Sequence, residues 1–351
     1  MKNLVAVACG ALTLGGCASV GPTTVSRDRF DYVEAISESW KRQMLLNLLK
    51  VRYADAPVFL DITSVISSYE FHGEAGIFGQ QAPEGRAGDS FLGANVNGSY
   101  TDRPTITYSP LSNDKFAKSL MAPIPVSGIV LLVQAGYPAD IVLRICANSV
   151  NGINNSYGGR GDARGDPRYQ ELMELMRKAQ DDGVLGMYSK KDADQTVVRM
   201  FLRGPEQKVA QYRRIGELLG LDPGLREYTL AYGVQPSQRD EIALQSRSMM
   251  QVLVDFGSYV DVPQRDIDEG RVYVPARDPE TLKLFPPLLH VHWSDKLPGD
   301  AQVGVRYRNA WFWIDDRDHR SKAAFNFLML LFSLTETGAA QAAPLVTVPA
   351  R

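Results

Sequence analysis

The sequence predicts an α+β fold, with helices, a mainly antiparallel sheet and a long β-hairpin over residues 67–101. Two observations carry this prediction. Between residues 168 and 257, segments with helical spacing of apolar residues alternate with short strands joined closely enough to form hairpins, which is typical of an antiparallel α+β layer. Within residues 67–101, two stretches alternate regularly between apolar and polar side chains, as strands with two different faces do.

Ahead of the hairpin we expect a helix over residues 32–53 and a strand over 58–66. Apolar residues recur at helical spacing from Ile36 through Trp40 to Leu49. Pro57 ends this helix, because the residue before a proline is disfavoured in the helical conformation. Residues 58–66 are rich in β-branched side chains, which favour a strand.

Beyond the hairpin the pattern alternates between helices and short strands. A loop rich in Gly, Asn, Asp and Arg at 151–167 divides an N-terminal α/β region (30–150) from a C-terminal α+β region (168–340), which a tail at 341–351 follows. The expected elements are a strand at 105–108, helices near 113–120, 125–135 and 139–148, a helix at 168–182, strands at 184–189 and 195–203, a helix at 205–220, a strand at 226–233, a helix near 241–257, strands near 288–293, 303–307 and 311–315, and a helix over about 321–334.

The first residues are organised like a bacterial lipoprotein signal. Lys2 is basic, residues 4–14 form an apolar run too short to span a bilayer, and Leu14-Gly15-Gly16 precedes Cys17. This Leu-Gly-Gly-Cys ending resembles a lipobox. We therefore expect residues 1–16 to be a cleaved signal peptide, Cys17 to carry the lipid, and residues 17–29 to form a tether; an ordinary secretory signal is the alternative.

Ala18 stands where inner-membrane retention signals usually place Asp, so we expect the lipid at Cys17 to lie in the outer membrane and the body in the periplasm. With 44% apolar and 22% charged residues, the chain has the composition of a globular protein. The formal net charge of −2 gives no reason to expect nucleic acid as a partner. Cys9 lies within the signal, which leaves Cys146 without a partner for a disulfide, and we expect it to be a core residue.

The predicted hairpin has an apolar and a polar face. Pairing Ile77 with Leu92 and Tyr69 with Tyr100 puts every apolar residue on one side and places Phe71 over Gly98; a slip of one residue would mix the two faces. The apolar face comprises Tyr69, Phe71, Ala75, Ile77, Leu92, Ala94, Val96 and Tyr100. The polar face comprises Glu70, His72, Glu74, Asn95 and Asn97.

The dimensions of this hairpin suit an outer-membrane β-hairpin with the apolar face toward lipid and the polar face toward a lumen. An arm of nine residues, tilted by about 40°, spans a distance close to the apolar band of outer-membrane barrels, which is about 25 Å. The link at 79–90 is polar and Gly-rich. Because an open strand edge is not tolerated in lipid, insertion would require several copies or other strand donors. The alternative is a soluble hairpin that packs its apolar face on the body.

Two polar clusters invite a chemical interpretation. His290 and His292 would share one face of a strand with Asp295 nearby, the beginning of a metal site, but no third ligand has a diagnostic spacing, so no metal is predicted. Asp315, Asp316, Arg317 and Asp318 lie where a strand ends and a helix begins. There, Asp316 and Asp318 are expected to cap helix amides and Arg317 to form an ion pair.

No other motif assigns a chemistry. The chain has neither a Gly-x-Ser-x-Gly elbow nor a P-loop, and no catalytic residue or cofactor is predicted. The tripeptides Arg160-Gly161-Asp162 and Arg164-Gly165-Asp166 resemble adhesion motifs, but such short motifs arise by chance in a loop of this composition.

Four strings resemble a family of uncharacterised proteobacterial lipoproteins: residues 43–53, 104–125, 136–152 and 305–334, the last containing WFWIDDRD at 311–318. The resemblance implies localisation in the envelope and a fold shared across most of the mature chain, and it assigns no functional residue. The sequence thus predicts a non-enzymatic, lipid-anchored structural or assembly component, as a homo-oligomer or in an envelope complex, with 67–101 hairpins forming a β-pore. The alternatives are a monomeric periplasmic module that binds through a sheet face around Trp293, Trp311 and Trp313 and, third, a hydrolase.

Overall fold

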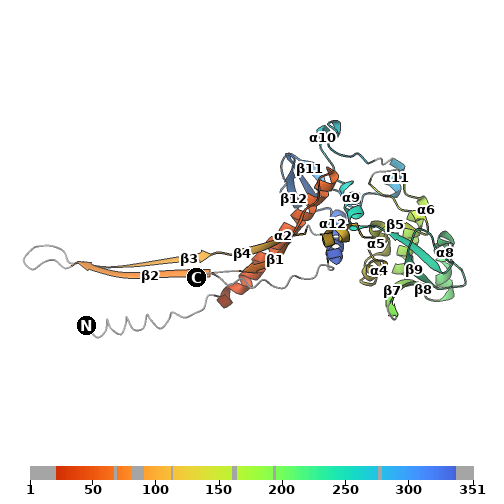
Figure 1. Cartoon of the computed structure of the whole chain (residues 1–351), viewed down its shortest axis with the longest axis horizontal. Helices are drawn as coiled ribbons and strands as arrows, with labels where there is room; N and C mark the ends of the chain where they lie inside the picture. The colour runs from red at the N-terminus through yellow and green to blue at the C-terminus, as the bar shows by residue number, and fades with distance from the viewer. Residues whose placement is uncertain are drawn as a thin grey trace, which may run out of the picture. The chain divides into compact units, whose positions relative to one another are not determined.

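The computed structural model describes residues 21–66, 69–80, 91–111, 114–159, 164–192, 195–275 and 279–336 (Figure 1). Over these residues the predicted α+β class is confirmed, with mainly antiparallel sheets. The chain divides into two compact units, one of Met1–Glu38 and Phe59–Leu111 and the other of Ser39–Val58 and Ser112–Arg351. The predicted signal peptide, Cys17, most of the hairpin link, the first Arg-Gly-Asp tripeptide and the tail lie outside the described residues.

The first unit contains the start of helix α2 (Gly21–Arg52) and four strands. α2 begins well before the predicted start at residue 32, so the described part of the expected tether is helical; Pro22 is tolerated in a first turn, where its missing amide would have no partner. The strands are β1 (Phe59–Ile66), β2 (Tyr69–Gln80), β3 (Phe91–Asp102) and β4 (Thr105–Leu111). β1 pairs with β4 and β2 with β3, both antiparallel.

The second unit is built around a six-stranded sheet with the order β6-β5-β10-β9-β8-β7. All its neighbours are antiparallel except β9 and β10, which run parallel. The strands are β5 (Ala147–Val150), β6 (Ile153–Asn154), β7 (Leu185–Asp192), β8 (Gln195–Leu202), β9 (Glu227–Tyr232) and β10 (Glu241–Ser246).

Several helices pack on this sheet. Leu143, Met176 and Leu219, from three different helices, meet side chains of β5 and β7–β10 around a small apolar cavity. The helices are α3 (Asp114–Met121), α4 (Val126–Gln134), α5 (Ala139–Cys146), α6 (Pro167–Asp181), α7 (Glu206–Ala210), α8 (Arg213–Leu219), α9 (Met249–Gly257), α10 (Gln264–Asp268), α11 (Pro279–Leu284) and α12 (His319–Glu336).

A smaller antiparallel sheet has the order β11-β13-β12, with β11 (His292–Ser294), β12 (Ala301–Tyr307) and β13 (Ala310–Asp315). Phe312 and Ile314 are fully buried on one face of β13, which contacts α12. The alternation of buried and partly exposed residues along β13 explains why the sequence pattern locates this strand to within one residue.

The predicted helix over residues 241–257 is wrong in its first part, since residues 241–246 form strand β10 and α9 begins only at Met249. β10 lies between β5 and β9 and is buried on both faces. Its apolar residues, Ile242, Ala243 and Leu244, are therefore consecutive rather than alternating, and periodicity does not distinguish them from part of a helix. Ser248 then starts α9 with a capping box in which its hydroxyl accepts from the Gln251 amide.

The end of the predicted helix at 139–148 and the loop at 151–167 also contain strand structure. α5 ends at Cys146, and residues 147–150 continue directly into β5, which pairs with β10. β6 lies inside the expected loop and pairs with β5. The division at residues 151–167 therefore differs from the structural one, because segments on both sides of it form a single sheet and core. The helix predicted over 205–220 is interrupted between α7 and α8.

Candidate functional site

The β2–β3 hairpin pairs over the whole of both strands, from Tyr69 opposite Asp102 to Gln80 opposite Phe91 (Figure 1). The predicted register is wrong by two residues, since Ile77 pairs with Ala94 rather than with Leu92. A shift of two leaves every side chain on its predicted face because the side-chain period of a strand is two. The apolar pattern therefore could not distinguish the two registers.

The pairing places all eight residues of the predicted apolar face on one side and all five of the predicted polar face on the other. On the apolar side, Ala75 pairs with Val96, and 82% of the Val96 residue surface and 48% of that of Tyr100 are exposed. Neither β2 nor β3 pairs with a third strand among the described residues. Among the described residues of this face, Val96 is therefore almost uncovered and Tyr100 is about half exposed.

A cross-strand glycine is covered by an aromatic ring, but by a different ring from the one predicted. Phe78 lies opposite Gly93 on the polar side, and a Cβ added to Gly93 would meet the Phe78 ring at 2.6 Å. Phe71 lies opposite Tyr100, not Gly98. A side chain at position 93 would therefore force the Phe78 ring to move from this position.

At the base of the hairpin, α2 contributes a charged pair to two tyrosines of the apolar face. The rings of Tyr69 and Tyr100 stack with centroids 6.1 Å apart. The Tyr69 hydroxyl donates to Asp28, and Arg27 hydrogen-bonds Tyr100 and pairs with Asp28 at 3.0 Å. These contacts raise the pKa of the Arg27 guanidinium, with the Tyr100 contact contributing most. The polar ends of both tyrosines are therefore satisfied at this end of the face.

The β1–β4 ladder continues the register of the β2–β3 ladder. Ile66 pairs with Thr105 and Tyr69 with Asp102. The same number of residues separates β1 from β2 as separates β3 from β4, so the pairing resumes in the same register. On β4, Ile106, Tyr108 and Pro110 share one face. Their partners are Val65, Ile62 and Leu60, so this face too is apolar on both strands.

A β-bulge at Thr63 keeps this apolar face continuous. Ile62 pairs with Tyr108 but Ser64 pairs with Thr107, so Thr63 is one extra residue on β1. Its hydroxyl donates to the carbonyl oxygen of Thr107. The β1 residues of this face, Leu60, Ile62 and Val65, lie at even positions before the bulge and at an odd position after it, and the extra residue brings them to the same side.

At the acidic turn before α12, Asp318 accepts hydrogen bonds from the Ser321 amide at 3.0 Å and from its hydroxyl at 2.6 Å, the geometry of a helix cap. Arg317 pairs with Asp315 and Asp300, not with Asp316. Asp316 contacts Lys322 at 2.9 Å. The cluster thus consists of a cap and surface ion pairs.

Replacing the cap residue, Asp318→Ala, is expected to lower the free energy of unfolding by about 0.5–2 kcal/mol. Hydrogen bonds from Ser321 lower the pKa of Asp318 below its ordinary value of 3.8. The stabilisation is therefore complete above pH 3.8 and lost as the pH falls through the lowered pKa. Urea unfolding at several pH values measures this loss of stability, with the exposed Asp316→Ala as control. If Asp318→Ala lowers the free energy of unfolding by the same amount at all these pH values, the helix cap is contradicted.

His290 and His292 lie side by side, with ring centroids 4.1 Å apart, and the acidic residue that joins them is Asp261 rather than the expected Asp295. Asp261 Oδ2 is 2.8 Å from His290 Nε2 and 3.9 Å from His292 Nδ1. Burial and the neighbouring His290 lower the pKa of His292. Asp261 lies far from both histidines in the sequence, so no local residue spacing predicts that these three side chains come together.

The three tryptophans proposed as a binding face do not share one face. Trp293 pairs with Phe312, whereas Trp311 and Trp313 pair with Ser294 and His292. Neighbouring residues on a strand point to opposite sides, so Trp293 faces away from the other two. The three tryptophans therefore do not form one binding surface.

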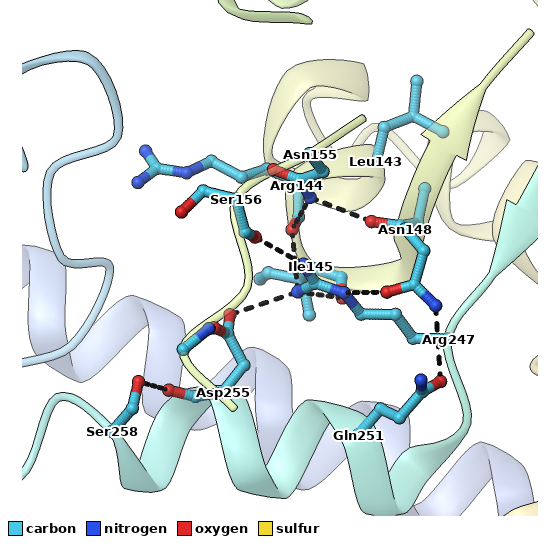
Figure 2. A network of polar contacts seen from close by, with 12 residues as sticks. Leu143, Arg144, Ile145, Asn148, Asn155, Ser156, Arg247, Gln251, Asp255 and Ser258 are labelled. Carbon is cyan, nitrogen blue, oxygen red and sulfur yellow. Dashed lines mark hydrogen bonds and ion pairs between the residues drawn. The ribbon is translucent and has the colours of Figure 1, made fainter. Parts of the chain in front are cut away.

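A buried ion pair links the 155–158 segment to the second unit's core (Figure 2). Arg247 donates to Asp255 at 3.1 Å, and their side chains are only 1% and 3% exposed. The same guanidinium donates to carbonyl oxygens of Ile145 and Ser156, while Asp255 accepts from the Gly158 amide. All these groups are enclosed, so the network holds the fold and offers no surface to a ligand.

Cys146 lies near this network and is fully buried. Burial raises the pKa of its thiol to about 12, so the thiolate required of a nucleophile does not form at neutral pH. Arg247, Asp261 and the Arg27–Asp28 pair were not predicted from the sequence. For Arg247 there was a signal: a lone arginine between two apolar stretches.

Among the described residues, no helix combines the length and the apolar content needed to cross a membrane. Comparison with protein-family models, with curated proteins and with solved structures finds no match for the chain. The resemblance to proteobacterial lipoproteins therefore stays a prediction.

Proposed function

We propose that this chain is a non-enzymatic, lipid-anchored protein of the outer membrane whose β2–β3 hairpin crosses the bilayer together with hairpins of other copies and lines a pore. The observation that carries the proposal is the uncovered apolar face of a two-stranded ladder, on which Val96 is 82% exposed. An isolated two-stranded hairpin is marginally stable in water. A second apolar environment is needed to cover this face, and the outer membrane supplies one to a lipoprotein.

The length and charge pattern of the hairpin support membrane insertion. β2 and β3 have 12 residues each, and a transmembrane strand requires about 9–11. No charged residue lies on the apolar face between Tyr69 and Tyr100. Glu70 and Glu74 lie on the other face, where a water-filled lumen would solvate them.

The base of the hairpin suits a membrane–water interface. Tyr69 and Tyr100 combine apolar rings with hydroxyl groups that contact Asp28 and Arg27, and tyrosine is enriched at such interfaces. Gly21 begins α2 four residues after Cys17. Four extended residues and two helical turns reach at most about 25 Å, so a lipid on Cys17 lies within that distance of Asp28. Lipid and interface would then act at the same end of the hairpin.

Closure of the strand edges implies more than one copy. In a single hairpin, the outer edges of β2 and β3 have no partner strand among the described residues. Unpaired backbone amides and carbonyl groups cost several kcal/mol each in hydrocarbon. Hairpins from neighbouring copies can pair these edges into a closed barrel, with the polar face of each turned inward.

Cysteine labelling on intact cells tests the proposal. A cysteine at Gly85 or Gly88, in the link between β2 and β3, is expected to react with an impermeant maleimide because the link would lie outside the cell. Cysteines at the exposed positions Gln207 and Gly299 are expected to react only after the outer membrane is permeabilised. Cys146 is buried and does not interfere. Equal protection of all four positions would rule out insertion.

A further inference from the structure

A group of side chains outside the hairpin has the composition and spacing of a metal site. Within the described residues, one ligand atom from each of Asp261, His290 and His292 lies within 4.8 Å of the other two. Ligand atoms on a tetrahedral zinc ion with bonds of about 2.0–2.2 Å are about 3.3–3.6 Å apart. Asp261 Oδ2 is 2.8 Å and 3.9 Å from the two imidazole nitrogens. Small side-chain rotations therefore suffice to place all three around one ion.

The backbone next to these side chains is fixed. Val260 and Val291 form a parallel bridge and are buried, and the Asp261 amide donates to the Val291 carbonyl oxygen at 2.9 Å. This bridge holds Asp261 against the two histidines that flank Val291. The three residues thus come from two chain segments in a set alignment, and not from one mobile loop.

Neighbouring groups orient the histidines. The His290 amide donates to the Ser321 hydroxyl at 2.8 Å, and that hydroxyl donates to Asp318. The His292 ring lies against Trp313, with centroids 4.8 Å apart. The first contact fixes the backbone at His290, and the second limits the positions open to the His292 ring.

We infer that Asp261, His290 and His292 bind a divalent transition-metal ion, for which zinc is the best fit. Two imidazole nitrogens and one carboxylate oxygen are zinc ligands, and three protein ligands leave a fourth position open. The side chains of His290 and Asp261 are 49% and 50% exposed, so this fourth position faces solvent. Water or a donor group of another molecule would complete the tetrahedron. This inference does not depend on the proposed pore.

Zinc titration of the full-length protein in detergent, produced without a polyhistidine tag, tests the inference. Competition with a chromogenic chelator is expected to give one zinc ion per chain. Asp261→Asn and His292→Ala are each expected to weaken binding on the order of tenfold or more. Zinc is also expected to raise the thermal unfolding midpoint of the wild type and not of these variants, an effect that EDTA reverses.

His72→Ala and His319→Ala are the matched controls. His72 lies on the hairpin 2.7 Å from Glu70, and His319 is the first residue of α12. Neither should change zinc binding. The inference is overturned if the wild type binds no stoichiometric zinc, if Asp261→Asn and His292→Ala bind as the wild type does, or if His72→Ala removes the binding.

Discussion

Val96→Arg is expected to keep the β2–β3 hairpin out of the membrane while leaving the thermal unfolding of the body unchanged. Val96 lies near the middle of β3, on the apolar face opposite Ala75. An arginine facing lipid near the bilayer midplane costs about 2–4 kcal/mol, and in an oligomer this cost recurs in every copy. With a cysteine in place of Gly88, loss of its labelling by the impermeant maleimide in intact cells measures the failure to insert.

Asn97→Arg is the matched control, one residue away on the polar face. Asn97 pairs with Glu74, so an arginine there faces a carboxylate across the strands. Insertion and labelling should be retained in this variant. Since Val96 is 82% exposed, a soluble hairpin would tolerate both substitutions. Equal labelling of the two variants, or a lowered unfolding midpoint in Val96→Arg, contradicts the membrane hairpin.

Asp255→Ala is expected to lower the free energy of unfolding by about 3–5 kcal/mol, the largest stability change of the predictions made for this chain. The substitution leaves the Arg247 guanidinium buried without its counterion and removes the acceptor of the Gly158 amide. Denaturant unfolding monitored by circular dichroism measures the loss.

Glu171→Ala provides the comparison, since it breaks an exposed pair with Arg214 at 2.8 Å. Such surface pairs contribute about 0–1 kcal/mol. Replacing both partners, as in Arg247→Met with Asp255→Leu, should recover part of the loss because no charge is then left buried. A similar cost for Asp255→Ala and Glu171→Ala would mean that the buried pair has no special role.

The faces of the hairpin were predictable from the sequence because strand periodicity assigns each residue to a side. The register was not, since pairing Ile77 with Leu92 or with Ala94 gives the same faces. Only the backbone ladder distinguishes them. The same limit applies to residues 241–246, where a central strand buried on both faces has no periodicity to reveal it.

The candidate metal site was only half predictable. His290 and His292 are two residues apart, so their shared side could be expected from strand geometry. Asp261 joins them through the bridge between Val260 and Val291, a tertiary contact that no local pattern encodes. Tertiary contact also separates the three tryptophans, because the pairing of β11 with β13 decides which side each one takes.

Because of the bulge at Thr63, the faces of β1 depend on the number of residues in this strand rather than on which residue occupies position 63. Thr63 has no partner residue on β4, so the pairing of Ile62 and Ser64 places no requirement on its side chain. Loss of the residue cannot be tolerated in the same way, because it would turn every residue on one side of the bulge through half a rotation about the strand. Related chains that conserve this hairpin should therefore substitute freely at this position and yet show no single-residue gap.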